Sequence, residues 1–65
     1  MAIKIIEVIG VGESMESAVE NAVEEAAKTI RKIQGVDVVG WTAKTDGGKI
    51  SSWSADVKIA FEVER

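Results

Sequence analysis

The sequence contains no cysteine, no histidine and no proline. Without cysteine the chain has no disulfide and no thiolate metal site, and without histidine it lacks the commonest transition-metal ligand and general base. No proline-rich or low-complexity segment divides the 65 residues, so we expect a single domain over residues 1–65. No apolar run is long enough for a signal peptide or a membrane span, which predicts a cytoplasmic protein with no membrane partner.

The small size of the chain predicts association. A domain of this length buries only about 60% of the surface of its unfolded chain and is marginally stable alone. Small domains gain stability from disulfides, metals or subunits, and association is the remaining means here. The net charge of −3 argues against a nucleic-acid partner. We therefore expect a homo-oligomer.

Three extended runs and one amphipathic helix are expected. The runs cover residues 3–11, 36–45 and 49–64. Ser14 is a favourable N-cap for the helix, and Gly35 is expected just past its C-terminal end. The apolar stripe of the helix comprises Val19, Ala22, Val23, Ala26, Ile30 and Ile33. Asp46-Gly47-Gly48 indicates a tight hairpin turn. These signals predict an α+β fold of order β-α-β-β, in which a three-stranded antiparallel sheet wraps around the helix.

Alternation along the strands predicts which side chains face the helix. In the last run, one parity is apolar and is expected to cover the helix: Trp53, Val57, Ile59, Phe61 and Val63. The first run is apolar on both faces, and we expect Ile6 and Val8 to point away from the helix. Trp41 has the opposite parity to Val36 and Val38, so it is also expected to point away, toward a neighbouring subunit or a ligand.

No arrangement of residues indicates catalysis. The glycines of Gly10-Val-Gly12 precede a helix, but a third glycine or a Gly-Lys-Ser/Thr sequence is missing, so a sharp turn explains them better than phosphate binding. The serines have no histidine to activate them. The acidic residues are dispersed, and Asp37, Asp56 or Glu62 would hold a hard cation only if symmetry gathered them around an axis. We expect neither an enzyme nor a metal site within one chain.

The whole chain resembles the dodecin family. The similar segments, in order, are Lys4-Ile-Ile-Glu-Val-Ile-Gly10, Ala18-Val-Glu-Asn-Ala-Val23, Lys28-Thr-Ile-Arg31, Asp46-Gly-Gly-Lys-Ile50 and Val57-Lys-Ile-Ala-Phe61. The resemblance implies a hollow homododecamer of tetrahedral symmetry. It also implies flavin ligands (FMN, FAD or riboflavin), bound as stacked pairs between subunits and stored rather than transformed.

The chain departs from the family pattern at the positions that contact flavin. Gly35 stands where flavin-binding dodecins carry a stacking tryptophan, and Ser54 stands where they carry a glutamine or arginine. Glycine has no π-face, and a serine hydroxyl cannot make a two-point amide contact. The expected cofactor-site residues are Gly35, Ser54 and Trp41, the last as a stacking group from a neighbouring subunit. The resemblance thus implies a flavin-storing shell with reduced or lost affinity; the alternative is a structural or cation-binding cage without flavin.

Overall fold

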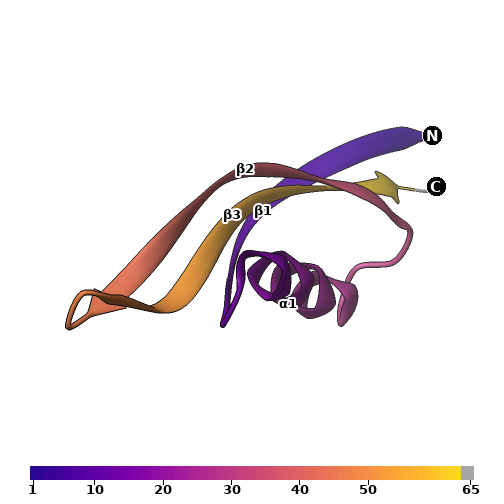
Figure 1. The fold of residues 1–65 in the computed structure, drawn as a ribbon. Helices are drawn as coiled ribbons and strands as arrows, with labels where there is room; N and C mark the ends of the chain where they lie inside the picture. Colours follow the sequence, from indigo (N-terminus) through magenta and orange to yellow (C-terminus); the bar gives the residue numbers. More distant parts are fainter. Residues whose placement is uncertain (64–65) are drawn as a thin grey trace.

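The computed structural model describes residues 1–63. Strand β1 (Ala2–Gly12) is followed by helix α1 (Met15–Ala27), strand β2 (Ile33–Asp46) and strand β3 (Lys49–Val63). The strands form one antiparallel sheet in the order β1-β3-β2. The curved sheet arches over α1, and the hairpin of β2 and β3 extends beyond the helix (Figure 1). The predicted β-α-β-β order and three-stranded antiparallel sheet are confirmed.

The N-terminus of α1 is fixed by two serines. The Ser14 hydroxyl accepts a hydrogen bond from the Ser17 backbone N–H at 3.0 Å. The Ser14 N–H in turn donates to the Ser17 hydroxyl at 2.9 Å, which completes a capping box. These bonds satisfy amide groups that the first turn leaves without partners. The predicted N-cap is confirmed.

The C-terminus of α1 lies earlier than predicted. The helix ends at Ala27 with Lys28 as its C-cap, and Gly35 lies inside β2, opposite Ala60. The prediction that Gly35 follows the helix was therefore wrong. Ile30 and Ile33 pack against the core from the connection and from the start of β2. Their helical spacing thus reflects burial of their side chains and not a continuing helix.

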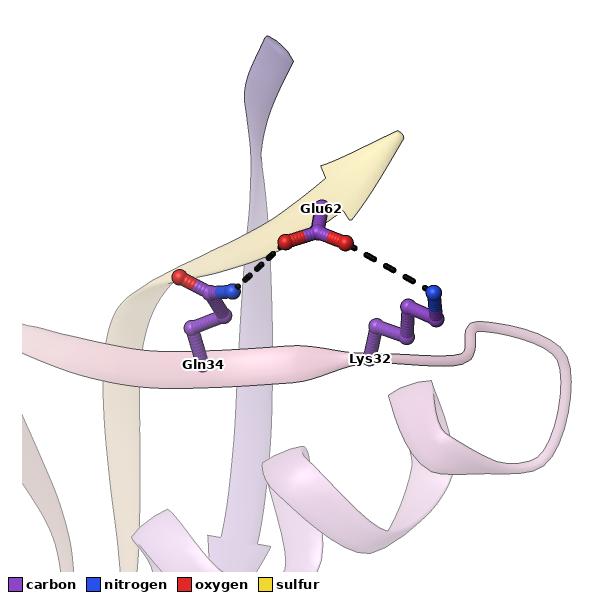
Figure 2. A network of polar contacts seen from close by, with 3 residues as sticks. All are labelled: Lys32, Gln34 and Glu62. Carbon is purple, nitrogen blue, oxygen red and sulfur yellow. Dashed lines mark hydrogen bonds and ion pairs between the residues drawn. The ribbon is translucent and has the colours of Figure 1, made fainter. Parts of the chain in front are cut away.

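The connection between α1 and β2 is held at its end by the backbone and the side chain of Glu62. Lys32 has a positive φ of 61°, an uncommon conformation for a residue with a side chain. Its carbonyl oxygen accepts the Glu62 N–H at 3.1 Å, and its Nζ lies 3.6 Å from Glu62 Oε2. Gln34 Nε2 donates to the other carboxylate oxygen at 3.2 Å (Figure 2). Together these contacts attach the first residues of β2 to the end of β3.

The core lies between α1 and the middle of β3. Its buried residues are Ala18, Ala22 and Ala26 from the helix and Ala55, Val57 and Ile59 from the strand. Small helix residues let the backbones approach closely, and Gly10 of β1 has the same role. A Cβ at Gly10 would collide with the Ala18 carbonyl oxygen and lie 2.7 Å from the Ala22 Cβ. The predicted stripe is thus shifted, because the alanines form its centre while Val19 and Val23 are only partly buried.

β1 presents the opposite face from the one predicted. Ile6 lies opposite Ile59 and Val8 opposite Val57. Directly paired residues of neighbouring strands share a face of the sheet, so Ile6 and Val8 face the helix, where both pack against the core. The prediction that they point away was wrong, because a run that is apolar at both parities does not show which face is covered.

The turn between β2 and β3 and the orientation of Trp53 follow the predictions. Gly47 and Gly48 have φ values of 59° and 81°, which tight two-residue hairpin turns require. Trp53 lies opposite Gly12 and Ala43 and packs against the core from the helix side of β3. Its side chain is half-buried within one chain.

A candidate ligand-binding face

The sheet face turned away from α1, here called the outer face, is rich in exposed apolar side chains. On β1 it carries every second residue: Ile3, Ile5, Glu7, Ile9 and Val11. Ile5 is 62% exposed and Ile9 is 68% exposed. Soluble monomers seldom leave such a row of β-branched residues uncovered, so the outer face is the candidate binding surface.

Gly35 forms an open position on this face. Gly35 lies opposite Ala60. Ala60 follows Ile59 on β3 and therefore points to the outer face, because Ile59 points to the helix. A Cβ placed on Gly35 would have no atom within 4 Å, and the φ of Gly35 is not positive. A larger side chain therefore fits here without strain, and the glycine leaves a flat area of backbone beside Ala60.

Ser54 lies on the same face but far from Gly35. It is half-buried and pairs with Val11 on β1 and Thr42 on β2. Ser54 and Ala60 are six positions apart on β3, which corresponds to about 20 Å along an extended strand. One chain therefore does not bring Gly35 and Ser54 together, and a site that uses both requires a second copy.

Trp41 lies on the helix side, contrary to the prediction. Val39 is an extra residue in β2, because Val38 pairs with Val57 and Gly40 with Asp56. This β-bulge reverses the alternation, so Trp41 lies opposite the buried Ala55. Its indole Nε1 donates to the Met15 carbonyl oxygen in the first turn of α1 at 3.2 Å. The side chain is still 41% exposed, at the margin of the helix-covered face.

The same bulge creates a hollow that the sequence analysis missed. The hollow has a volume of about 260 Å³ and is lined by Ile9, Val39, Gly40, Trp41, Thr42 and Asp56. A Cβ at Gly40 would have no atom within 4 Å. The sequence signal was Gly40 itself, since glycine in a strand often marks a bulge. Asp56 brings a carboxylate into this otherwise largely apolar surface.

Asp56 and Glu7 are two acidic residues of the outer face that interact with each other. Asp56 Oδ1 is buried and has no hydrogen-bond donor. A hydrogen bond to Asp56, and then the charge of Asp56, raise the pKa of the Glu7 carboxyl above its ordinary value; slight desolvation adds to this and Lys58 opposes it. No pattern in the sequence indicates this pair, because the pairing depends on the register between β1 and β3.

Among residues 1–63, no group of three or more acidic side chains is arranged to hold a metal ion. Within the same described residues, no helix has the length and apolar composition needed to cross a membrane. The outer face offers exposed apolar side chains such as Ile5 and Ile9, together with a few carboxylates and hydroxyls.

Comparison with known proteins agrees with this geometry. The model of the Dodecin family matches residues 2–64. The chain belongs to the Dodecin family. The dodecin from Streptomyces coelicolor has a TM-score of 0.92 at 28% identity, over 98% of this chain and 93% of that chain. The dodecin from Streptomyces davaonensis has a TM-score of 0.91 at 20% identity, over 98% of this chain and 96% of that chain.

The comparisons confirm the dodecin resemblance and the fold. No curated protein sequence gives a significant match. The residues expected to contact a ligand in this dodecin therefore have to be judged from the geometry of the outer face.

Proposed function

We propose that this dodecin forms a cytoplasmic homododecameric shell through its outer face and holds flavin (FMN, FAD or riboflavin) with low affinity, without catalysing a reaction. Family membership supports the shell and the ligand class. The observation that carries the ligand part is the open, flat backbone at Gly35 on an otherwise apolar face. A planar ring can lie there, but it meets no aromatic side chain of the same chain.

The surface area of the chain supports association. A compact monomer of 6.9 kDa is expected to expose roughly 4000 Å². This chain exposes 4786 Å², about 800 Å² more. That excess equals the area that one partner buries in an interface of standard size. The radius of gyration of 13.4 Å also exceeds the value of about 11 Å expected for a compact chain of this length.

The reduced flavin affinity rests on Gly35 and Ser54. A stacking contact contributes on the order of 1 kcal/mol beyond burial, and an amide-type hydrogen bond contributes a similar amount. With the cost of an unpaired polar edge on the ring, the combined loss is roughly 3 kcal/mol, or about a hundredfold in affinity. We therefore expect the protein to purify colourless.

The test is a flavin-fluorescence quenching titration of the wild type and of the Gly35→Trp/Ser54→Gln variant. The double variant should bind riboflavin about a hundredfold more tightly, in line with the lost contacts. The matched control is Gly40→Trp/Ser54→Gln, which places tryptophan at another open glycine of the same strand and face. Tight quenching by the wild type, or equal gains in both variants, would contradict a site centred on Gly35.

A cage without flavin is the second candidate. Two observations favour it. Gly35 has no aromatic side chain on which a flavin could stack, and Gly35 and Ser54 lie far apart within one chain. The same titration separates the two functions. A wild type and a double variant that both fail to quench riboflavin, while remaining assembled, would favour the cage.

A further inference from the structure

Glu7 and Asp56 are diagonal neighbours on the outer face. Glu7 lies opposite Lys58 and Ile9 lies opposite Asp56, so the two carboxylates occupy adjacent rows of the β1–β3 pair. Diagonal neighbours in antiparallel strands are within reach of each other's side chains. Glu7 is exposed, whereas Asp56 is half-buried at the edge of the hollow beside Gly40.

The buried oxygen of Asp56 is missing one donor. Oδ1 is shielded from solvent and has no hydrogen-bond partner. An unsatisfied buried acceptor is costly, and two ionised carboxylates in contact repel each other. A proton on Glu7 removes the repulsion and provides the Asp56 carboxylate with a donor, because a protonated carboxyl can donate a hydrogen bond. The raised pKa of Glu7, whose largest cause is the hydrogen bond to Asp56, agrees with this geometry.

The other charges on this face do not replace that proton. Lys58 is paired with Glu7 on β1 and with Asp37 on β2, so its one positive charge lies beside two acidic residues. On β1, Glu7 has the apolar Ile5 and Ile9 as its neighbours on the outer face. The helix covers the opposite face of the sheet, so its acidic and basic residues do not face the pair (Figure 1).

We infer that Glu7 and Asp56 share a proton, and that this carboxyl pair makes the association of copies through the outer face tighter in mildly acidic solution than at neutral pH. The inference rests on the proposed assembly through this face. Association removes water from the row that contains Glu7, and desolvation penalises ionised acids further. Burial in an interface therefore costs less free energy for the pair that carries a proton than for the fully ionised pair.

The sign of the pH dependence follows from linkage. The associated state binds the Glu7 proton more strongly than the free chain does. Its advantage is complete at low pH and is lost as the pH rises through the pKa of Glu7 in the assembly, which lies above the ordinary value of 4.5. For each proton taken up, the association constant changes by at most tenfold per pH unit.

The test measures the dissociation of the assembly by analytical ultracentrifugation from about pH 4, below the ordinary Glu7 pKa of 4.5, to about pH 8. The wild type should dissociate more readily toward pH 8. Glu7→Gln provides a permanent amide donor for Asp56, so it should stay as tightly associated as the acidic wild type at every pH. Asp37→Asn, a matched change beside Lys58 on the same face, should keep the wild-type pH dependence.

Four outcomes would contradict the proposed pH dependence, here called the switch. A shell whose dissociation is independent of pH, or a Glu7→Gln shell with the wild-type dependence, contradicts the switch but leaves the assembly intact. A chain that is monomeric at every pH contradicts the assembly and the switch together. A second measurement, the ¹³C shift of the Glu7 carboxyl followed against pH, should give a pKa above the ordinary value of 4.5 in the wild type and a lower pKa in Asp56→Asn. Identical titrations would show that no proton is shared.

Discussion

The two faces of the sheet use the same strands in different ways. On the helix side, Ala55, Val57 and Ile59 are fully buried against a row of alanines. On the outer face, the alternate residues Ile5 and Ile9 are more than half exposed although they are as large as the buried Ile59. The middle of the helix side is therefore covered within one chain, whereas Val36 and Trp41 at its margin are each 41% exposed. The outer face has exposed apolar side chains, open space at Gly35 and an Asp56 carboxylate oxygen without a donor. A second molecule could cover the apolar side chains and fill the space.

This difference between the faces assigns stability to the helix side and binding to the outer face. The helix side tolerates little change, because backbone atoms already touch at Gly10. Two of the outer-face glycines, Gly35 and Gly40, have empty space above them. Substitutions on the helix side should therefore change folding, and substitutions on the outer face should change association or ligand binding.

The largest effect is expected from aspartate placed on either side of β1. Ile6→Asp puts an unpaired carboxylate beside Ile59 and should cost roughly 3–5 kcal/mol, enough to unfold a marginal domain. Ile5→Asp puts the same group on the outer face, so the chain should fold but fail to associate. Circular dichroism and light scattering separate the two results. If Ile6→Asp folds normally and only dissociates, Ile6 belongs to the outer face after all.

The next largest effect is expected from adding one methyl group at a glycine of either face. Gly10→Ala forces a Cβ against the Ala18 carbonyl oxygen and should lower the free energy of unfolding by about 1–3 kcal/mol. Gly40→Ala adds the same methyl where no atom lies within 4 Å, so it should leave the stability unchanged or slightly higher. Urea denaturation of both variants tests the contrast. Equal losses would mean that α1 does not approach β1 as closely as the structure shows.

Local signals predicted most of the fold. The serine cap, the two-glycine turn and the alternation of β3 each depend on residues close in sequence, and each prediction was confirmed at Ser14, Gly47 and Ile59. The end of α1 was predicted too late, because Ile30 and Ile33 bury their side chains without being helical. The orientation of β1 was wrong because both parities are apolar, so only its pairing with β3 decides which face is covered.

The candidate site was less predictable. Trp41 was assigned to the wrong face, because a single extra residue at Val39 reverses every orientation after it and leaves only a glycine as a sequence signal. The pairing of Glu7 with Asp56 joins residues far apart in the chain, and only the strand register brings them together. Gly35 and Ser54 were identified by resemblance, and their roles in binding stay predictions.

The smallest effect concerns the two tryptophans of the helix side, of which Trp41 lies at the margin and Trp53 packs against the core. Trp41→Phe removes the indole donor to the Met15 carbonyl oxygen and should lower the free energy of unfolding by about 1 kcal/mol. The remaining Trp53, which packs against the core, should then emit at shorter wavelength and be quenched weakly by iodide. In the matched Trp53→Phe variant, Trp41 is 41% exposed and should be quenched more strongly. The reverse order of quenching would place Trp53, not Trp41, at the open margin of the sheet.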